Sequence, residues 1–509
     1  MVLPTNRAAL DPIYAQDINE IAAEVNTLLT RIAQLGGGLS GQTLAKLSDA
    51  SYDYAWRTFA GGGGGGGSSY LVTVASADTP IALKSAATYV CDGIADEEEI
   101  QGAIDELPST GGWVQLLAGN FNLTAPIRLD HHGIALVGSG VASLHTASQL
   151  ALGTRLSVAE GFSGAAVVLA QLVADNACIS SITLRDFTVD GGAVTGGQAG
   201  ILLKAHTSSV SDVRVARTTG DGLRMEGYDS WAAYDNVLTR VIASNNLGAG
   251  IHLSTNAQDA HLTNNIAFQN TNGIRIRGAS HQITAAHIYN NDNNGIHFDN
   301  NGSRTKILGL KCEGNQHHGI LFDNTTAGTS DVKIGGASSF KNNGEAATNT
   351  YDHISFGQGT AAHTRATISD CSFSIANPEN GNLPRSAIYA NNSATQGLSI
   401  TGCNFPGSTA YGTGAIITGS TATLSTGANS YGASAVGKGG SRGIASVANG
   451  GTIPINLART PTYYQVTPTV AGHVAVVTAA SATSLTVSLQ TNAGAAVTTA
   501  ESVSYIAEI

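Results

Sequence analysis

Charged residues are scarce in this chain of 509 residues. Lys and Arg number 25 and Asp and Glu number 36, so charged side chains make up 12% of the chain, against roughly 25% in an average soluble protein. The net charge is −11, so the chain has no basic excess with which to wrap nucleic acid. No apolar run reaches the roughly 18 residues of a membrane-spanning helix, and we expect no membrane insertion.

Cysteine is also rare. The five cysteines are odd in number and widely spaced, and they match neither a disulfide framework nor a Cys-x-x-Cys metal site. The sequence begins without an apolar segment of the signal-peptide kind, so we expect no secretion by that route. We predict neither a metal ion nor a cofactor.

Glycine, by contrast, is abundant, with 62 residues or 12% of the chain, against about 7% on average. A run of glycines within residues 61–69, closed by two serines, predicts a flexible linker. It separates an N-terminal attachment region, residues 1–36 and 37–69, from everything that follows. The hydrophobic content of 42% is enough to fill a large core in that remainder.

A heptad pattern occupies residues 1–36. Fewer than three heptads are marginal as an isolated helix, so the pattern predicts a coiled coil that needs partner chains. The alternative is one amphipathic helix that packs on its own domain. The apolar positions are Ile18, Val25 and Ile32 at a, and Ile21, Leu28 and Leu35 at d.

A glycine followed by Ile or Leu recurs every 22 to 28 residues. A period in the twenties predicts a solenoid, and the lack of a helical pattern in each repeat favours a coil of short parallel strands and turns. We therefore predict an all-β protein in which residues 70–432 form a right-handed, single-stranded parallel β-helix. The clearest pairs are Gly200-Ile201, Gly222-Leu223, Gly250-Ile251, Gly273-Ile274, Gly295-Ile296 and Gly319-Ile320.

The residue types of the repeat suit such a coil. We expect each of these glycines to supply an unusual backbone dihedral at the turn that enters a strand. We expect Asn to tolerate left-handed turns and to stack in ladders. Cys312, Cys371 and Cys403 are expected to occupy similar inward places in the partner strand.

Two segments flank the repeat. Residues 96–107 predict a helix with Asp96 as its N-cap, and we expect this helix to cover the open end of the coil. Beyond the repeat, residues 433–509 predict a small sandwich-like β domain, with strands at 462–468 and 483–490.

The outward face of the coil offers possible chemistry. If the Ile of each Gly-Ile pair points inward, the first and third residues after it point outward. Asp299 and Asp323 then lie on adjacent coils, about 4.8 Å apart at the backbone, which is compatible with the carboxyl separations of about 5–9.5 Å in glycosidases. We predict that this pair is catalytic and that His297, Arg277 and Arg275 bind substrate. The alternative is structural, because each aspartate precedes an Asn in an ordinary polar strand exit.

Aromatic residues gather in the single 28-residue step of the repeat, which predicts a loop off the coil. We predict that Trp231 and Tyr228 stack on sugar rings there. They can equally cover a small core of the loop itself.

Three segments resemble known protein families. The opening of pectate-lyase-like β-helix proteins resembles residues 89–129, YVCDGIADEEEIQGAIDELPSTGGWVQLLAGNFNLTAPIRL. The N-terminal regions of bacteriophage tail and minor tail proteins resemble LPTNRAALDPIYAQDINEIAAEVN and LAKLSDASYDYAWRTF, and a small C-terminal β domain of such proteins resembles residues 450–509. These resemblances imply a phage tail fibre or tailspike in the virion tail. They also imply a homotrimer that docks on tail or baseplate proteins through its N-terminal region and attaches to bacteria.

Three functions remain open from the sequence. The first is a tail fibre or tailspike that binds a surface polysaccharide or another receptor without cleaving it. The second is a tailspike depolymerase, either a glycoside hydrolase or a polysaccharide lyase, although the sequence has no dense acidic cluster for a calcium-dependent lyase. The third is a cellular surface-associated β-helix protein, which the phage-like ends disfavour.

Overall fold

The computed structural model divides the chain into two compact units, Met1–Ser68 and Ser69–Ile509. The residues that it describes are 42–46, 54–58, 70–142, 153–172, 177–192, 198–228, 231–323, 328–357, 362–376, 381–390, 395–405, 411, 414–418, 424–427, 429–431, 440–455, 457 and 460–508. In the first unit, β1 (Gln42–Lys46) pairs antiparallel with β2 (Tyr54–Thr58). The predicted heptad helix and the glycine linker lie outside the described residues.

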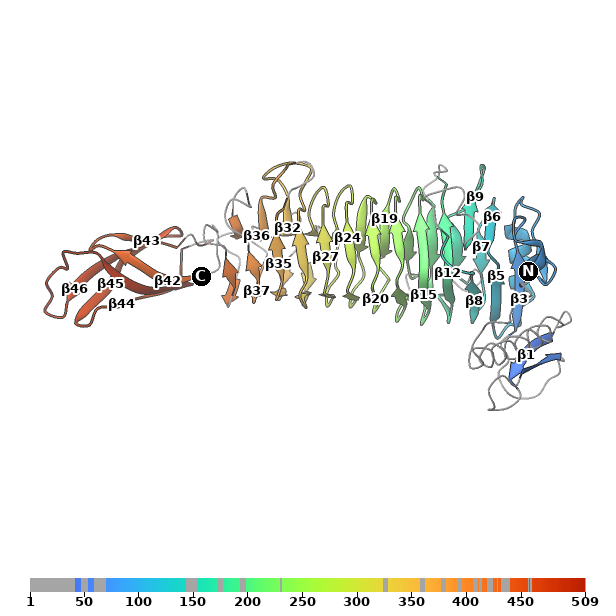
Figure 1. Ribbon diagram of the computed structural model, residues 1–509, viewed down its shortest axis with the longest axis horizontal. Coiled ribbons are helices and arrows are strands. Elements are labelled where there is room, and N and C mark those ends of the chain that lie inside the picture. The colour runs from blue at the N-terminus through green and yellow to red at the C-terminus, as the bar shows by residue number, and fades with distance from the viewer. Residues whose placement is uncertain are drawn as a thin grey trace, which may run out of the picture. The chain divides into compact units, whose positions relative to one another are not determined.

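The second unit contains a parallel β-helix, in which the chain winds through three sheets in each coil (Figure 1). Sheet one is a separate eleven-stranded sheet in which every neighbouring pair of strands is parallel. Its strands, in order of pairing, are β7 (Ile127–Leu129), β10 (Ala166–Ala170), β13 (Ala199–Leu203), β16 (Leu223–Met225), β19 (Ala249–Leu253), β22 (Asn272–Ile276), β25 (Ile296–Phe298), β28 (Ile320–Phe322), β32 (Asp352–Phe356), β36 (Ser386–Ala390) and β39 (Gly414–Thr418).

Sheets two and three are joined because two long strands, β12 (Thr183–Asp190) and β15 (Ser209–Ala216), run through both. The other strands of sheet two are β3 (Leu71–Ala75), β5 (Gly112–Leu116), β8 (Ile134–Val137), β17 (Val237–Thr239), β20 (His261–Thr263), β23 (Gln282–Thr284), β26 (Lys306–Leu308), β30 (Lys333–Gly335), β34 (Thr367–Ser369), β37 (Leu398–Thr401) and β40 (Leu424–Gly427). The other strands of sheet three are β6 (Gly119–Leu123), β9 (Thr154–Val158), β18 (Ile242–Ser244), β21 (Ile266–Phe268), β24 (His287–Tyr289), β27 (Lys311–Glu313), β31 (Ser339–Lys341), β35 (Ser372–Ser374), β38 (Asn404–Phe405) and β41 (Ser430–Tyr431).

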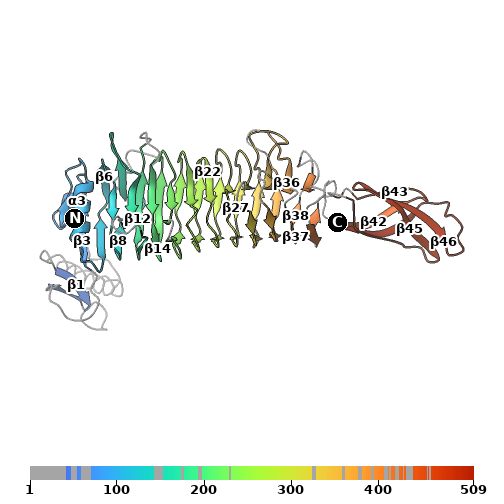
Figure 2. The same cartoon turned by 180° about the vertical axis from the view of Figure 1, so that it is seen from behind.

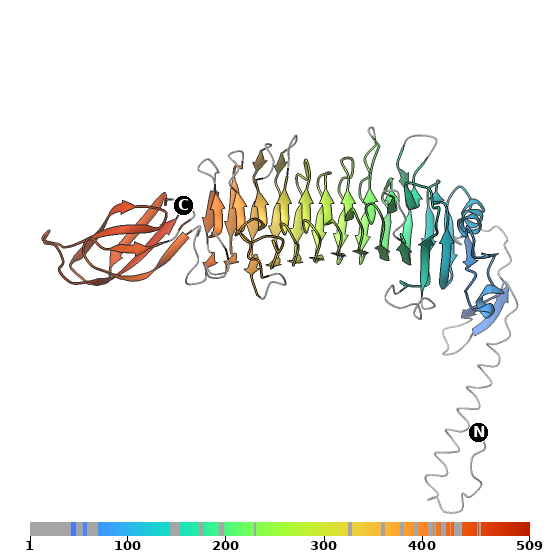
Figure 3. The same cartoon turned by 90° about the horizontal axis from the view of Figure 1, so that it is seen from above.

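Shorter elements complete the coil. The two-residue strand β4 (Tyr89–Val90) pairs with β3, and one turn of helix, α2 (Ile81–Lys84), precedes it. Two short parallel ladders lie at strand entries, and they join β11 (Ile179–Ser180) to β14 (Ala205–His206) and β29 (Thr329–Ser330) to β33 (His363–Thr364). A view from above shows the successive coils stacked side by side (Figure 3).

The interior of the coil is a stack of aligned apolar side chains. The Ile or Leu of each Gly-Ile pair is fully buried and lies in register with its equivalents on the neighbouring coils, as predicted. Phe298, Phe322 and Phe356 form a ladder of stacked rings, with centroids 4.4 and 4.3 Å apart. Because each coil places the same residue type above the last, the repeat in the sequence becomes continuous packing along the axis.

The corners between sheets two and three are left-handed turns, which let the chain change direction without a loop. Asp186, Asp212, Arg240 and Asn264 occupy this corner on successive coils, with φ between 52° and 63°. Asp and Asn tolerate this region better than most residues do. The expectation that Asn serves in such turns therefore holds, although Asp and Arg share the task.

The glycines of the Gly-Ile pairs have a different role from the predicted one. None of the six has a positive φ. A Cβ atom at Gly250 would lie 2.8 Å from both Gly273 O and the Asn270 side-chain amide. These positions exclude every larger residue because the next coil passes too close, and dihedral freedom is not the reason.

Five of the six glycines, all but Gly200, are approached by the side-chain amide of an asparagine, and these asparagines form a buried ladder. Along the ladder, the side-chain N–H of each asparagine donates to the side-chain oxygen of the next, with N···O distances of 2.7–3.1 Å. Its members are Asn246, Asn270, Asn291, Asn315 and Asn343. All five are buried, so the ladder satisfies amides that would otherwise be unpaired in the core. The predicted asparagine stack is confirmed.

The cysteines are all buried, but they do not form one column. Cys312 is in register with Phe340, whereas Cys371 and Cys403 come directly before the strands that continue that column. The expectation of similar places is wrong for Cys312, which lies two positions further along its coil. A period that varies from coil to coil hides such offsets in the sequence.

A helix, α3 (Glu97–Asp105), packs against β3 and β7 at the N-terminal end of the coil (Figure 2). Its apolar side, Ile100, Ala103 and Ile104, is fully buried. Asp96 makes no capping hydrogen bond, contrary to the prediction, because its carboxylate accepts the backbone N–H groups of Gly93 and Asn122. The carboxylate thus ties the helix start to β6 instead of to its own first turn.

The C-terminal residues form two antiparallel three-stranded sheets, and the two predicted strand segments correspond to β44 and β46. One sheet contains β42 (Gly440–Val447), β47 (Glu501–Glu508) and β44 (Tyr463–Pro468), and the other contains β43 (Thr452–Pro454), β46 (Ser484–Thr491) and β45 (His473–Ala480). Leu485, Val487 and Leu489 supply buried positions. None of the helices in the described ranges is both long and apolar enough to span a membrane.

Candidate functional site

The outward side of sheet one carries a column of charged and imidazole side chains. Arg224, His252, Arg275 and His297 lie in direct register on β16, β19, β22 and β25. Parallel coils are about 4.8 Å apart, so the column repeats on the scale of a polymer that lies along it. We call this surface the sheet-one face, and the predicted residues Arg275, Arg277, His297, Asp299 and Asp323 all belong to it.

Asp299 is held by two arginines. Its Oδ2 accepts Arg275 Nε at 2.9 Å and Arg277 Nε at 2.8 Å, and a second Arg275 nitrogen also contacts it. Partial burial works against ionisation, but the hydrogen bonds and charges of the two arginines outweigh it and lower the pKa of Asp299. Asp299 is therefore an ionised group at neutral pH and is unsuited to act as a general acid.

His297, on the same coil as Asp299, and Asp323, on the next coil, form a looser pair. His297 Nε2 lies 3.7 Å from Asp323 Oδ2. Burial lowers the pKa of His297 despite the two neighbouring carboxylates, so the imidazole is neutral near pH 7. A neutral imidazole and a partly exposed carboxylate next to an ionised aspartate can exchange protons with a ligand.

A second pair, which the sequence reasoning did not connect, lies on the same face. Asp221 precedes β16 and its Oδ2 is 2.7 Å from His252 Nδ1 on the next coil. Burial alone would raise the pKa of Asp221, but the hydrogen bond and charge of His252 bring it below its usual value. His252 is only 3% exposed, and its Nε2 has no partner among the described residues. Aligning the repeats around the 28-residue step would have placed the two residues diagonally adjacent.

The predicted aromatic residues lie beside the N-terminal part of this face. Tyr228 lies under Lys204 Nζ, which is 4.6 Å from the ring centroid, and donates its hydroxyl to Leu172 O at 3.3 Å. Trp231 pairs with Tyr228 through the backbone and is 56% exposed. Tyr228 thus packs against the coil, while Trp231 leaves its side chain open to solvent.

Further along the face the charges are again paired. Arg385 holds the fully buried Asp352 through two hydrogen bonds of 3.0 and 2.6 Å. The guanidinium carbon of Arg385 is 3.5 Å from the ring centroid of Tyr389. Burial raises the pKa of Asp352, and Arg385 offsets part of that effect.

One group elsewhere could place three metal-ligating atoms together. Cys91, Asp96 and Glu99 bring one ligand atom each within 4.8 Å of the others. The two Asp96 oxygens already accept backbone N–H groups, as described above. The carboxylate serves the fold here, and burial raises the pKa of Cys91, which disfavours the thiolate that binds metals.

A comparison with models of known protein families agrees with the β-helix fold. A family model described as the right handed beta helix region matches residues 162–286. A comparison with curated protein sequences finds no match.

Several solved structures are similar over most of the chain. The A-module of the Azotobacter vinelandii mannuronan C-5 epimerase AlgE6 is 16% identical, with a TM-score of 0.46 over 67% of this chain and 96% of that chain. Tailspike protein 2 from an Escherichia coli O157:H7 bacteriophage is 15% identical, with a TM-score of 0.49 over 92% of this chain and 66% of that chain. The tailspike gp49 of Pseudomonas phage LKA1 is 12% identical, with a TM-score of 0.45 over 81% of this chain and 92% of that chain. At these identities the likeness concerns the fold alone.

Proposed function

We propose that this chain is a phage tail fibre or tailspike, homotrimeric in the virion tail, that attaches the virion to a polysaccharide of the bacterial surface. The observation that carries the proposal is the sheet-one face, where charged and imidazole side chains repeat from coil to coil in strict register. A polymer with repeating polar groups can contact several coils at once, which raises its affinity without any single strong contact.

The remaining parts of the proposal rest on the sequence. The N-terminal heptad pattern supports self-association, and the phage-like segments on both sides of the glycine linker support docking to tail or baseplate proteins. Sedimentation of the purified full chain tests the trimer. A mass near three times 51.7 kDa supports it, and a monomer contradicts it.

Attachment is tested with the fluorescently labelled full chain on a panel of bacterial strains. Binding should be lost when purified surface polysaccharide of the bound strain competes. Arg277→Ala, which removes a cation from the sheet-one face, should weaken binding, while Arg365→Ala, which removes one from an exposed pair on sheet two, should not. Equal binding by both variants would refute the role of this face.

A second candidate function is a depolymerase that uses the predicted pair Asp299 and Asp323. The two arginines suit Asp299 to the role of an ionised nucleophile or base, which leaves Asp323 as the acid. Haloes on host lawns and new reducing ends or unsaturated products would support it. If Asp299→Asn with Asp323→Asn still cleaves at the wild-type rate, this pair is not catalytic.

A further inference from the structure

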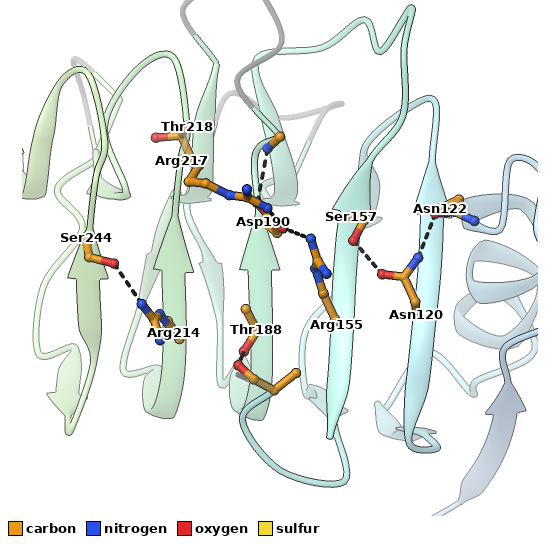
Figure 4. Close-up of polar contacts among 12 residues, drawn as sticks. Asn120, Asn122, Arg155, Ser157, Thr188, Asp190, Arg214, Arg217, Thr218 and Ser244 are labelled. Atoms are coloured by element: carbon orange, nitrogen blue, oxygen red, sulfur yellow. Dashed lines mark hydrogen bonds and ion pairs between the residues drawn. The ribbon is translucent and has the colours of Figure 1, made fainter. Parts of the chain in front are cut away.

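A second cluster of charge lies on sheet three, away from the sheet-one face. Arg155 and Arg217 contact a single carboxylate, Asp190, which is 1% exposed, and Arg214 lies on the neighbouring strand β15. Figure 4 shows Asp190 between Arg155 and Arg217, with Arg214 extending from the neighbouring strand toward Ser244. We call these four residues the arginine cluster.

The arginine cluster has more cations than it can neutralise. Asp190 accepts Arg217 Nε at 2.8 Å and also contacts Arg155 and a second Arg217 nitrogen. Burial would raise the pKa of Asp190, but the arginines lower it, so the carboxylate is ionised. Three guanidinium groups around one carboxylate leave a local charge of +2 in a chain whose net charge is −11.

Arg214 is the arginine of the cluster that makes no ion pair with any residue the structure describes. It donates a 3.4 Å hydrogen bond to Ser244 Oγ, and its Nε is buried with no partner within the described parts of the chain. The Nε of Arg155 is buried and unpartnered as well, but Arg155 lies two coils away, with Thr188 in register between it and Arg214. Half-buried guanidinium groups are costly when unpaired, and planar N–H forks fit carboxylate or phosphate oxygens.

An aromatic pair lies next to this cluster on the following coils. Ser244 is in register with Phe268, and Phe268 with Tyr289. The two rings stack with centroids 4.9 Å apart and 5° between planes, and both are half-buried on the outward side. On the other side of Phe268 the column continues with Ser244 and Ala216, two small residues that separate the ring from Asp190.

We propose that Arg214 of the arginine cluster and Phe268, two coils further on, form a binding subsite for an anionic sugar, in which Arg214 holds the carboxylate or phosphate and Phe268 packs against the sugar ring. A guanidinium without an ion pair beside an aromatic ring favours a ligand that carries an anionic group on a ring with an apolar face. This inference rests on the proposed function, because it names the chemistry of the polysaccharide that the virion would contact.

The test is affinity electrophoresis of the full chain. Gels contain polygalacturonate, which carries carboxylates, poly(glycerol phosphate), which carries phosphates, or neutral dextran. The wild type should be retarded in one or both anionic gels and not in dextran, and the anionic gel that retards it identifies the group. Arg214→Ala should weaken that retardation about tenfold, as expected for loss of a charge-assisted hydrogen bond, and Phe268→Leu should weaken it less.

Arg365→Ala is the matched control, because it also removes one positive charge but lies on an exposed pair with Asp331. It should leave retardation unchanged. Circular dichroism of each variant verifies that the coil is intact, and Arg214→Lys should recover part of the affinity. No retardation of the wild type in either anionic gel, or equal losses in Arg214→Ala and Arg365→Ala, would overturn the inference. Binding to bacteria in the absence of any retardation would leave the proposed function standing and remove this subsite alone.

Discussion

The interior of the coil and its outward faces use polar groups in opposite ways. Inside, neighbouring asparagines of the buried ladder bond to one another from coil to coil, and its ends bond to Thr218 and His353, so the amides are satisfied within the coil. Outside, the sheet-one face pairs its carboxylates with arginines or imidazoles, whereas the arginine cluster keeps a surplus of cations. The difference teaches that a satisfied polar ladder stabilises the fold, while an unsatisfied charge at the surface marks a place for a ligand.

Among single substitutions, the largest expected effect lies in the interior. Phe322→Ala removes the central ring of the aromatic ladder, which is fully buried. We expect a loss of about 3–5 kcal/mol in the free energy of unfolding, from lost transfer energy and the remaining cavity. Denaturant unfolding measures it. His261→Ala, at an exposed position of β20, is the control, and an equal effect of the two would contradict the packing described.

Acid should also destabilise the interior, through its buried histidines. Burial lowers the pKa of His281, His318 and His353 to about 3. An unfolded histidine takes up a proton near pH 6.5, so the unfolded state binds more protons between pH 6.5 and 3. Stability from these neutral histidines is present above pH 6.5 and should fall as the pH decreases, by about 1.4 kcal/mol per pH unit for each.

The measurement is the free energy of unfolding at pH 7, 6, 5 and 4. His281→Asn should have a shallower slope than the wild type, because one titrating group is gone. Parallel slopes would show that His281 is already charged in the folded state.

A smaller loss is expected in the asparagine ladder. Asn291→Ala leaves its neighbours Asn270 and Asn315 with unpaired groups in the core. We expect a loss of about 1–3 kcal/mol, the usual cost of buried polar groups without a partner. Thermal unfolding checks this, with Asn293→Ala, which lies outside the buried ladder, as the control.

The smallest effect on stability belongs to the outward faces. Arg365→Ala breaks an exposed ion pair with Asp331, so we expect no measurable change in the unfolding midpoint. Asp299→Asn, in a partly buried pair with Arg275, should cost less than Asn291→Ala but should weaken polysaccharide binding. If both surface changes destabilise the coil as much as the ladder change does, the distinction between interior and face fails.

Much of the interior was predictable from the sequence. The Gly-Ile repeat located the strands of sheet one. Its alternation distinguished inward from outward residues, because an apolar residue of each coil must face the axis. The role of the glycines was predicted wrongly, since the close approach of the asparagine ladder depends on the neighbouring coil and leaves no local signal.

The faces were harder to predict. The alternation correctly placed five residues on one face, since all follow the same Gly-Ile register: Arg275, Arg277, His297, Asp299 and Asp323. The arginine cluster and the pair Asp221–His252 join residues from coils of unequal length, so their contacts depend on loop insertions that shift the register. Which side chain pairs with which depends on rotamers, and periodicity does not specify them.

The most direct test of this account is a crystal structure of the full chain with a short oligomer of galacturonate. The account predicts density for the oligomer along an outward face of the coil, with a carboxylate at Arg214 and a sugar ring against Phe268. Density confined to the C-terminal sheets, or a complex in which Arg214 has no contact with the ligand, would contradict it.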